Sequence, residues 1–149
     1  MADVAAHPGS SWLIAGAWLS ILAALAHLAC IVGGPEWYRF FGAGEAMARA
    51  AGRGEWTPTL VTLGIAAMLL VWGAYALSGA GLLPRLPLLR TGLAVIAAIY
   101  LLRALAFVPL NLVTRHHSDG FAIISSLIVL IYGVVHAIGT AKAWEHLAR

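Results

Sequence analysis

Four long apolar stretches cover most of this chain and decide the solvent in which it folds. They occupy residues 12–33, 58–78, 87–109 and 121–141. Each is close to the ~20 residues that an α-helix needs to cross the apolar core of a bilayer. Lipid offers the backbone no hydrogen bonds, so such segments must be helical. The sequence therefore predicts an all-α fold: an antiparallel four-helix transmembrane bundle that forms a single domain over residues 1–149.

The composition agrees with a membrane environment and excludes several classes of function. Hydrophobic residues make up 62% of the chain and charged residues only 10%, whereas soluble domains carry ~25% charged residues. The net charge of +3 comes from loop residues, and no basic stripe suggests nucleic-acid binding. The single cysteine, Cys30, cannot form an internal disulfide, and we expect it to be a small packing residue. The N-terminus lacks the basic region of a signal peptide, so the first stretch is expected to be a retained helix.

Glycine and proline mark the expected helix ends. Gly33-Gly34-Pro35 should end the first helix, and Thr57-Pro58 should open the second. The longest segment outside the spans, residues 34–56, contains aromatic residues near helical spacing. It is compatible with one or two short helices in the membrane interface or with a loop that carries aromatic anchors.

The orientation of the bundle does not follow from charge. Four spans place both termini on one face, here called side A, and place the 34–56 segment on the other, side B. Lysine and arginine should mark the cytoplasmic face, but they are evenly divided, with Arg85, Arg90, Lys142 and Arg149 on side A and Arg39, Arg49, Arg53 and Arg115 on side B. We expect the termini to be cytoplasmic, because small four-span proteins commonly keep both ends inside.

Arg103 is the most informative polar residue. It lies in the third apolar stretch, about two turns from side B. An arginine at the centre of a membrane helix costs roughly 2.5–3.5 kcal/mol on insertion scales. Two interpretations stand side by side: an anchor for an anion or carbonyl in an internal pocket, or a side chain that extends to the interface or bonds a helix-end carbonyl.

His27 lies at a similar depth in the first stretch. Gly16, Ser20, Ala23 and His27 recur on one narrow face of small residues, which allows close helix packing in membranes. We therefore expect His27 to point into the bundle, either as a hydrogen-bonded packing residue or as a ligand contact.

Polar residues from all four spans share this depth. Thr62 of the second span and Ser125 and Ser126 of the fourth complete a layer with His27 and Arg103. Glu36, just beyond the layer, is predicted to neutralise Arg103, with His27 as its alternative neighbour. The candidate ligand-binding residues are therefore His27, Glu36, Thr62, Arg103, Ser125 and Ser126.

The other histidines considered are not expected to bind a cofactor. His136 lies nearer side A than His27, so the two are not expected to share one haem iron. His116 and His117, beside Asp119, are expected to be a solvated loop pair rather than a metal site. No hydrolase, zinc-protease or nucleotide-binding motif is present in the sequence. We therefore predict no metal and no cofactor.

Three segments carry a resemblance to a known kind of protein. GGPEWYRFFGAGE, WGAYALSGAG and LPLLR followed by IYLLRAL resemble small four-span bacterial inner-membrane proteins of no assigned function. The resemblance implies a bacterial inner membrane as the location. It implies no catalytic residues.

The leading functional hypothesis is a membrane protein that binds a small amphipathic or lipid-like ligand in the polar layer near the 34–56 segment. The rival hypothesis is a structural or accessory subunit that packs against a second copy or another membrane protein through the small residues Gly16, Ser20, Gly64, Gly73 and Gly133. A third is an enzyme acting on a lipid or quinone, with His27 as acid or base.

Overall fold

The computed structural model describes residues 7–114 and 119–148, with only the backbone of Asp119. The described residues contain no β-strand. The four long helices are α1 (Ser10–Phe40), α3 (Trp56–Gly79), α4 (Leu89–Thr114) and α5 (Asp119–Ala143); two short elements are α2 (Glu45–Gly52) and the 3₁₀ helix η1 (His146–Ala148). All four long helices contain a stretch long and apolar enough to cross a membrane. The predicted all-α, four-helix class is thus confirmed, while Arg115, His116 and His117 lie outside the described residues.

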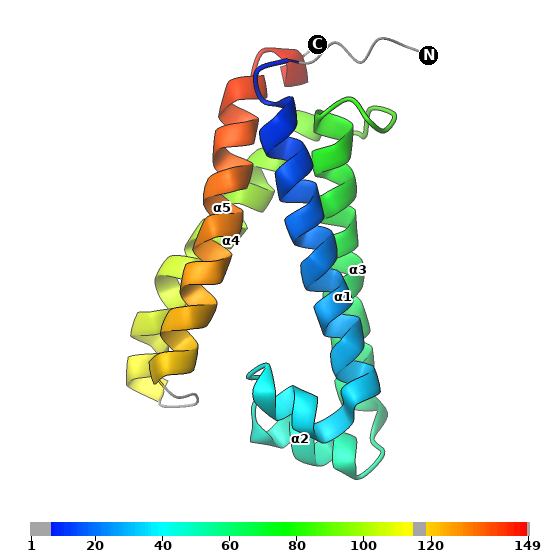
Figure 1. Cartoon of the computed structure of the whole chain (residues 1–149), viewed down its shortest axis with the longest axis vertical. Coiled ribbons are helices and arrows are strands. Elements are labelled where there is room, and N and C mark those ends of the chain that lie inside the picture. The colour runs from blue at the N-terminus through cyan, green and yellow to red at the C-terminus, as the bar shows by residue number, and fades with distance from the viewer. Residues whose placement is uncertain (1–6, 115–118, 149) are drawn as a thin grey trace.

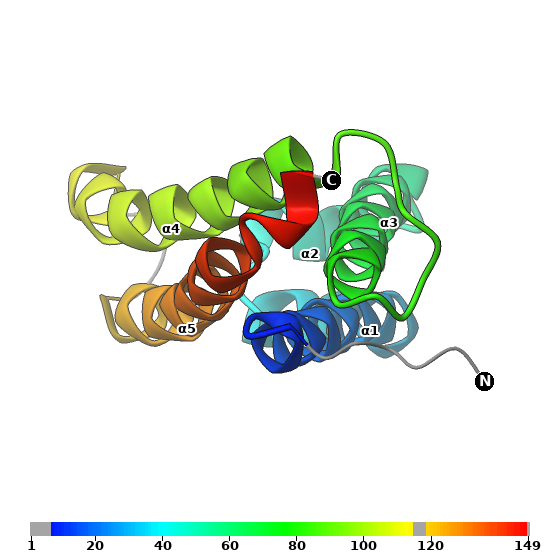
Figure 2. The same cartoon turned by 90° about the horizontal axis from the view of Figure 1, so that it is seen from above.

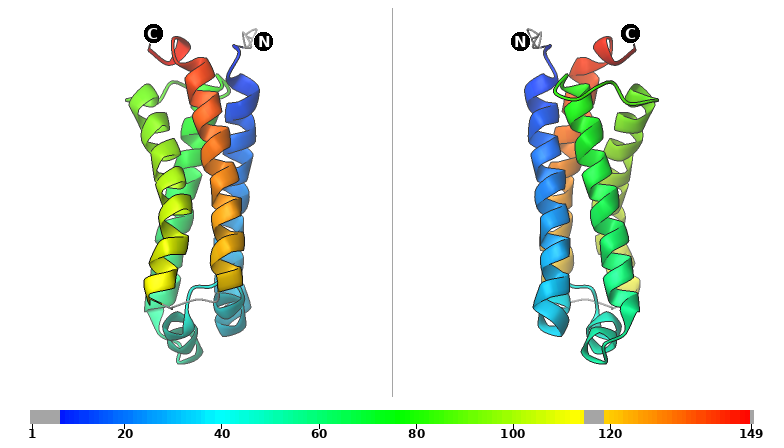
Figure 3. Two further views of the ribbon diagram at one scale, coloured as in Figure 1. Left: turned by 90° about the vertical axis from the view of Figure 1, so that its left-hand side faces the viewer. Right: turned by 90° about the vertical axis from the view of Figure 1, so that its right-hand side faces the viewer.

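The long helices are arranged as two antiparallel pairs. Helix α1 lies along α3, and α4 lies along α5, with more extensive packing inside each pair than between pairs. The pairs meet at the end that carries both termini and diverge towards the opposite end, where α2 lies (Figure 1). The view from above separates the two pairs, and the side views show the helices running the length of the bundle (Figures 2 and 3).

The buried core follows this divergence. At side A, all four long helices and η1 contribute to one cluster that includes Leu13, Ala76, Leu93, Ala143 and Leu147. A middle cluster draws its buried members from α1, α3 and α4 only. Near side B, the third cluster joins α1 to α2 through Cys30, Tyr38 and Ala48. The two helix pairs therefore share a core at side A and in the middle, but the cluster nearest side B belongs to α1 and α2.

Small residues permit the contacts between α1 and α5. A Cβ placed on Gly9 would come within 2.8 Å of Ala143, and one placed on Gly139 would come within 3.0 Å of Leu13. Both contacts lie near side A. Most of the glycines expected to form an external packing face instead contact other helices of the same bundle. Added Cβ atoms on Gly73 and Gly133 would meet Ile21 and Leu101, respectively.

Helix α1 changes direction where the sequence predicts its end. Gly34 has φ +66° and ψ −151°, a conformation that favours glycine, and Pro35 follows it. Helical backbone then resumes as far as Phe40. The 34–56 segment, which follows the first span, therefore contains this short continuation of α1 and the helix α2. Of the two alternatives for this segment, the structure has the short helices.

The helix of the third predicted span extends beyond the expected end at residue 109. Helix α4 continues through Pro109 to Thr114. A proline removes its own N–H donor from the helix, but neighbouring groups in a membrane bundle can compensate for that loss. The Thr114 hydroxyl donates a hydrogen bond of 3.0 Å to the carbonyl of Leu110 beyond the proline.

The outer surface of the bundle is apolar. Large exposed side chains occur on all four long helices, among them Leu22, Val71, Leu102 and Ile124, each more than half exposed. A soluble monomer rarely exposes contiguous apolar surface on this scale, whereas lipid-facing helices require it.

Candidate functional site

A cavity of about 340 Å³ lies at the side B end of the α1–α3 pair, beneath α2. Helix α1 lines it with Ala26, His27 and Cys30, and α3 lines it with Val61, Thr62 and Ile65. The rest of the wall comes from the end of α1, the connection to α2, and α2 itself: Tyr38, Phe41, Gly42, Ala43 and Met47. The cavity is therefore mostly apolar, with a few polar side chains from α1 and α3.

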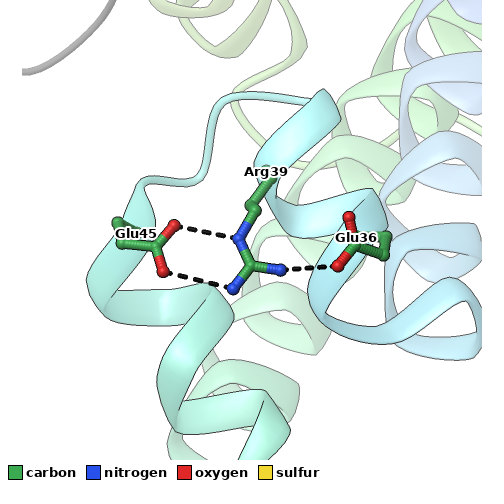
Figure 4. A network of polar contacts seen from close by, with 3 residues as sticks. All are labelled: Glu36, Arg39 and Glu45. Atoms are coloured by element: carbon green, nitrogen blue, oxygen red, sulfur yellow. Dashed lines mark hydrogen bonds and ion pairs between the residues drawn. The ribbon is translucent and has the colours of Figure 1, made fainter.

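An arginine clamp attaches α2 to the end of α1. Arg39 donates two hydrogen bonds to the carboxylate of Glu45, with Nε to Oε2 at 2.9 Å and Nη2 to Oε1 at 3.1 Å (Figure 4). Its Nη1 donates a third bond of 2.7 Å to Glu36. The hydrogen bond from Arg39 lowers the pKa of the Glu45 carboxyl. The clamp is exposed, so it directs α2 over the cavity more than it stabilises the fold.

Tyr38 ties the same region to α3. Its side chain is buried, and its hydroxyl lies 3.2 Å from Thr62 Oγ1, which lies 2.7 Å from the carbonyl oxygen of Pro58. Thr62 Oγ1 is the donor in both contacts, and its single proton serves one of the two acceptors at a time. The sequence did not predict Tyr38, because nothing in the aromatic run from Trp37 to Phe41 distinguishes the one ring that is buried.

His27 has one ring nitrogen committed to the backbone. Its Nδ1 lies 2.7 Å from the carbonyl oxygen of Ala23, one turn earlier in α1. In the neutral ring, Nδ1 therefore carries the proton and Nε2 is a hydrogen-bond acceptor. The half-buried ring lines the cavity, so this histidine combines a packing bond with a second nitrogen available to another group.

Arg103 lies on the other helix pair. Its Nη2 donates a 3.1 Å hydrogen bond to Ser125 Oγ, and its guanidinium lies 3.6 Å from the centroid of the Phe107 ring. Its Nη1 is buried and has no hydrogen-bond partner in the described part of the chain, and the same is true of Ser126 Oγ. The expected pairing of Glu36 with Arg103 is wrong: the turn at Gly34 directs the end of α1 away from the helix axis, and Glu36 pairs with Arg39.

The six candidate residues thus fall into separate groups instead of one layer. His27 and Thr62 line the cavity, Arg103 bonds Ser125 across the α4–α5 pair, and Glu36 is exposed. Similar depth did not bring them together, because the two helix pairs diverge at this end.

Two aromatic rings link Arg103 to the cavity wall. The Phe107 ring, beneath the guanidinium, lies 6.5 Å from the ring of Phe121. The Phe121 ring in turn lies against Gly42, where a side chain would overlap it, and Gly42 lines the cavity. Phe121 therefore contacts both Gly42 in the cavity wall and the ring beneath Arg103.

A second polar cluster joins both helix pairs in the middle of the bundle. Ser20 Oγ lies 3.0 Å from the Tyr100 hydroxyl and 3.5 Å from Nε2 of His136, whose Nδ1 lies 2.9 Å from the carbonyl oxygen of Tyr132. The carbonyl only accepts, so neutral His136 donates from Nδ1, Ser20 donates to Nε2, and Tyr100 donates to Ser20. Ser20 lies ten residues after Ser10, roughly 15 Å along the helix, so the cluster is close to half the depth of a bilayer.

His136 points into the bundle and is fully buried. It bonds Ser20 and Tyr132, whereas His27 bonds Ala23, so the two histidines belong to different sites. Among the described residues, no three His, Cys, Asp or Glu side chains are grouped closely enough to hold a metal ion.

The four apolar helices and their apolar outer surface define an integral, multi-pass membrane protein. Comparison of the chain with protein-family models, with curated proteins and with solved structures found no match.

Proposed function

We propose that this protein binds a small amphipathic or lipid-like molecule in the cavity beneath α2. The observation that supports this is the cavity itself, which lies beside the 34–56 segment and contains two of the predicted site residues, His27 and Thr62. Its volume of about 340 Å³ is within the usual range for small-molecule sites, ~300–1,000 Å³. The aliphatic and aromatic walls suit an apolar tail, and His27 Nε2 accepts a hydrogen bond from a hydroxyl or amide of the ligand.

We assign to Arg103 the role of anchoring a polar or anionic head group. A cation inside a membrane span is expensive unless it is paired, and Arg103 has one neutral hydrogen-bond partner, Ser125, and a buried Nη1 without one in the described residues. A carboxylate, phosphate or carbonyl oxygen of a ligand would supply the missing acceptor. In this proposal the head group reaches Arg103 past the ring of Phe121, while the tail occupies the cavity.

The accessory-subunit hypothesis receives less support from the packing. Gly16, Gly73 and Gly133 are already covered by side chains of the same bundle, and only Gly64 of the four glycines has nothing within 4 Å of an added Cβ. A single open glycine does not make a packing face.

Thermal unfolding in detergent tests the binding proposal. Wild type is screened against a fatty acid, a lysophospholipid and a short-chain quinone, beside Ala26→Phe, which fills the cavity, and Ala67→Phe, which adds the same ring on an exposed face of α3. We expect at least one compound to stabilise wild type and Ala67→Phe but not Ala26→Phe. Equal stabilisation of all three proteins, or of none, would refute the proposal.

Cys30 provides an independent readout of the same cavity. It is the chain's single cysteine, it lines the cavity and it is only 6% exposed. A compound bound there should slow its reaction with a small methanethiosulfonate reagent in wild type and leave the rate in Ala26→Phe unchanged. A stabilising compound that does not slow the reaction binds elsewhere and contradicts the assignment to this cavity.

We also propose that the protein resides in a bacterial inner membrane with its termini in the cytoplasm. Both described chain ends lie at the same end of the bundle (Figure 1). Reporter fusions at the C-terminus and within the 80–88 connection test this, because both should report the cytoplasm. A periplasmic signal from either fusion would overturn the orientation.

A further inference from the structure

A second, open groove of about 570 Å³ lies at side A, at the opposite end of the bundle from the cavity. The connection before α4, the first turn of α4 and η1 form its walls. Its polar side chains are Arg85, Arg90 and Thr91, and no aspartate or glutamate is among its lining residues. The groove is therefore lined by two cations and by no acid among the described residues.

The two arginines are held in different ways. Arg85 donates hydrogen bonds to the backbone carbonyls of His146 and Leu147, which fastens the connection to η1. The guanidinium of Arg90 lies 3.7 Å from the centroid of the Trp144 ring. Stacking over the ring occupies the face of the guanidinium but leaves the N–H groups at its edge available, and no described residue accepts a hydrogen bond from them.

We propose that this groove binds the phosphate group of an anionic membrane lipid. A guanidinium offers paired N–H donors that match two phosphate oxygens, and basic sites at the ends of membrane helices bind lipid head groups. Leu89, Arg90 and Thr91 are also the first residues of α4, where backbone N–H groups lack acceptors within the helix and favour an anion. This site is independent of the ligand cavity at side B.

The surface beside the groove favours a lipid over a free phosphate ion. Thr91 at the rim shares one face of α4 with Val95, Ile99 and Leu102, and all four are exposed. Leu88, which lines the groove, is 79% exposed. An acyl chain attached to the bound phosphate would lie along this apolar face, within the depth of the membrane.

Titration of the purified protein with lipid in dodecyl maltoside tests the proposal. Phosphatidylglycerol should raise the unfolding temperature in a saturable way, and phosphatidylcholine should not. Arg90→Gln should weaken the apparent affinity for phosphatidylglycerol about tenfold, the size expected for losing a charge-assisted pair. Arg90→Lys keeps the charge without the planar guanidinium. Its apparent affinity for phosphatidylglycerol should lie between those of wild type and Arg90→Gln. Lys142→Gln is the matched control, because Lys142 lies at the same end of the bundle, outside the groove lining.

Two further arms identify the source of the phosphate and the specificity of the site. Inorganic phosphate or glycerol 3-phosphate at matched ionic strength should leave the unfolding temperature unchanged; an increase equal to that with phosphatidylglycerol would overturn the lipid assignment. Native mass spectrometry should show less retained phosphatidylglycerol on Arg90→Gln than on Lys142→Gln. Equal retention, or equal affinity of the two variants, would overturn the site.

Discussion

The backbone of Gly16 lies directly against the imidazole of His136. A Cβ placed on Gly16 would come within 2.9 Å of the ring carbon Cε1. The fully buried histidine therefore fills the space that the missing side chain leaves. This contact joins α1 to α5, and thus one helix pair to the other, beside the Ser20–Tyr100–His136 cluster.

Adding a side chain at Gly16 should separate the helix pairs. Gly16→Leu forces the histidine or the helix to move, and we expect it to lower the free energy of unfolding by about 1–3 kcal/mol, the usual effect of overpacking. Gly64→Leu is the matched control, because nothing lies within 4 Å of a Cβ at that position. Unfolding in mixed detergent measures both. Equal stability of the two variants would show that the contact does not join the pairs.

The hydrogen bond between Ser20 and Tyr100 should appear as a coupling energy. Ser20→Ala and Tyr100→Phe each remove the same 3.0 Å bond, so the double variant should be less destabilised than the sum of the two. We expect a coupling energy of about 0.6 kcal/mol, the average between membrane helices, and no more than about 1.7 kcal/mol. A double-mutant cycle on unfolding free energies provides this value. Strict additivity would mean that the bond contributes nothing.

Arg103 should reduce the stability of the ligand-free protein. Replacement by methionine removes a cation whose Nη1 has no hydrogen-bond partner among the described residues, and it keeps an unbranched side chain over Phe107. We expect Arg103→Met to be more stable than wild type by about 1–2 kcal/mol, less than the full insertion cost of an arginine at the bilayer centre. The variant should also lose stabilisation by any ligand with an anionic head. A less stable variant would instead assign Arg103 a structural role.

The clamp on α2 should depend on pH through Glu45. The hydrogen bond from Arg39 lowers the pKa of this carboxyl below its ordinary value of 4.5. The contribution of the ionised Glu45 carboxylate to stability is therefore complete above about pH 4.5 and is lost as the pH falls through the lowered pKa. Titration of the Glu45 side-chain carbonyl carbon by NMR should show a lower midpoint in wild type than in Arg39→Gln. Equal midpoints would mean that the clamp does not form in solution.

Local chemistry was sufficient to predict the spans and some of their ends. Apolar length alone predicts four helices. Gly33-Gly34-Pro35 predicts the end of the first helix, and α1 changes direction there before it resumes to Phe40. Pro109 shows the limit of such local signals. The same residue type that accompanies the turn in α1 lies inside α4, which continues through it to Thr114.

The candidate site could be predicted only in part. His27 and Thr62 line the cavity as proposed site residues, because position along each helix determined their depth. The sequence did not predict Tyr38 as a site residue, and it predicted the wrong partner for Glu36. The backbone turn at Gly34 decides where both side chains point. Depth along a helix is a property of the sequence, but the direction of a side chain around the bundle is not.

The sequence by itself predicted four helices long and apolar enough to span a membrane, because an apolar stretch of ~20 residues satisfies its own backbone hydrogen bonds as a helix. Tertiary structure alone decided how those helices pair. Close approach at Gly9, Gly16 and Gly139 holds the pairs together near side A, and their divergence separates Arg103 from the cavity that contains His27. It also places Gly16 against His136, a contact between residues 120 positions apart that no local pattern of polarity encodes.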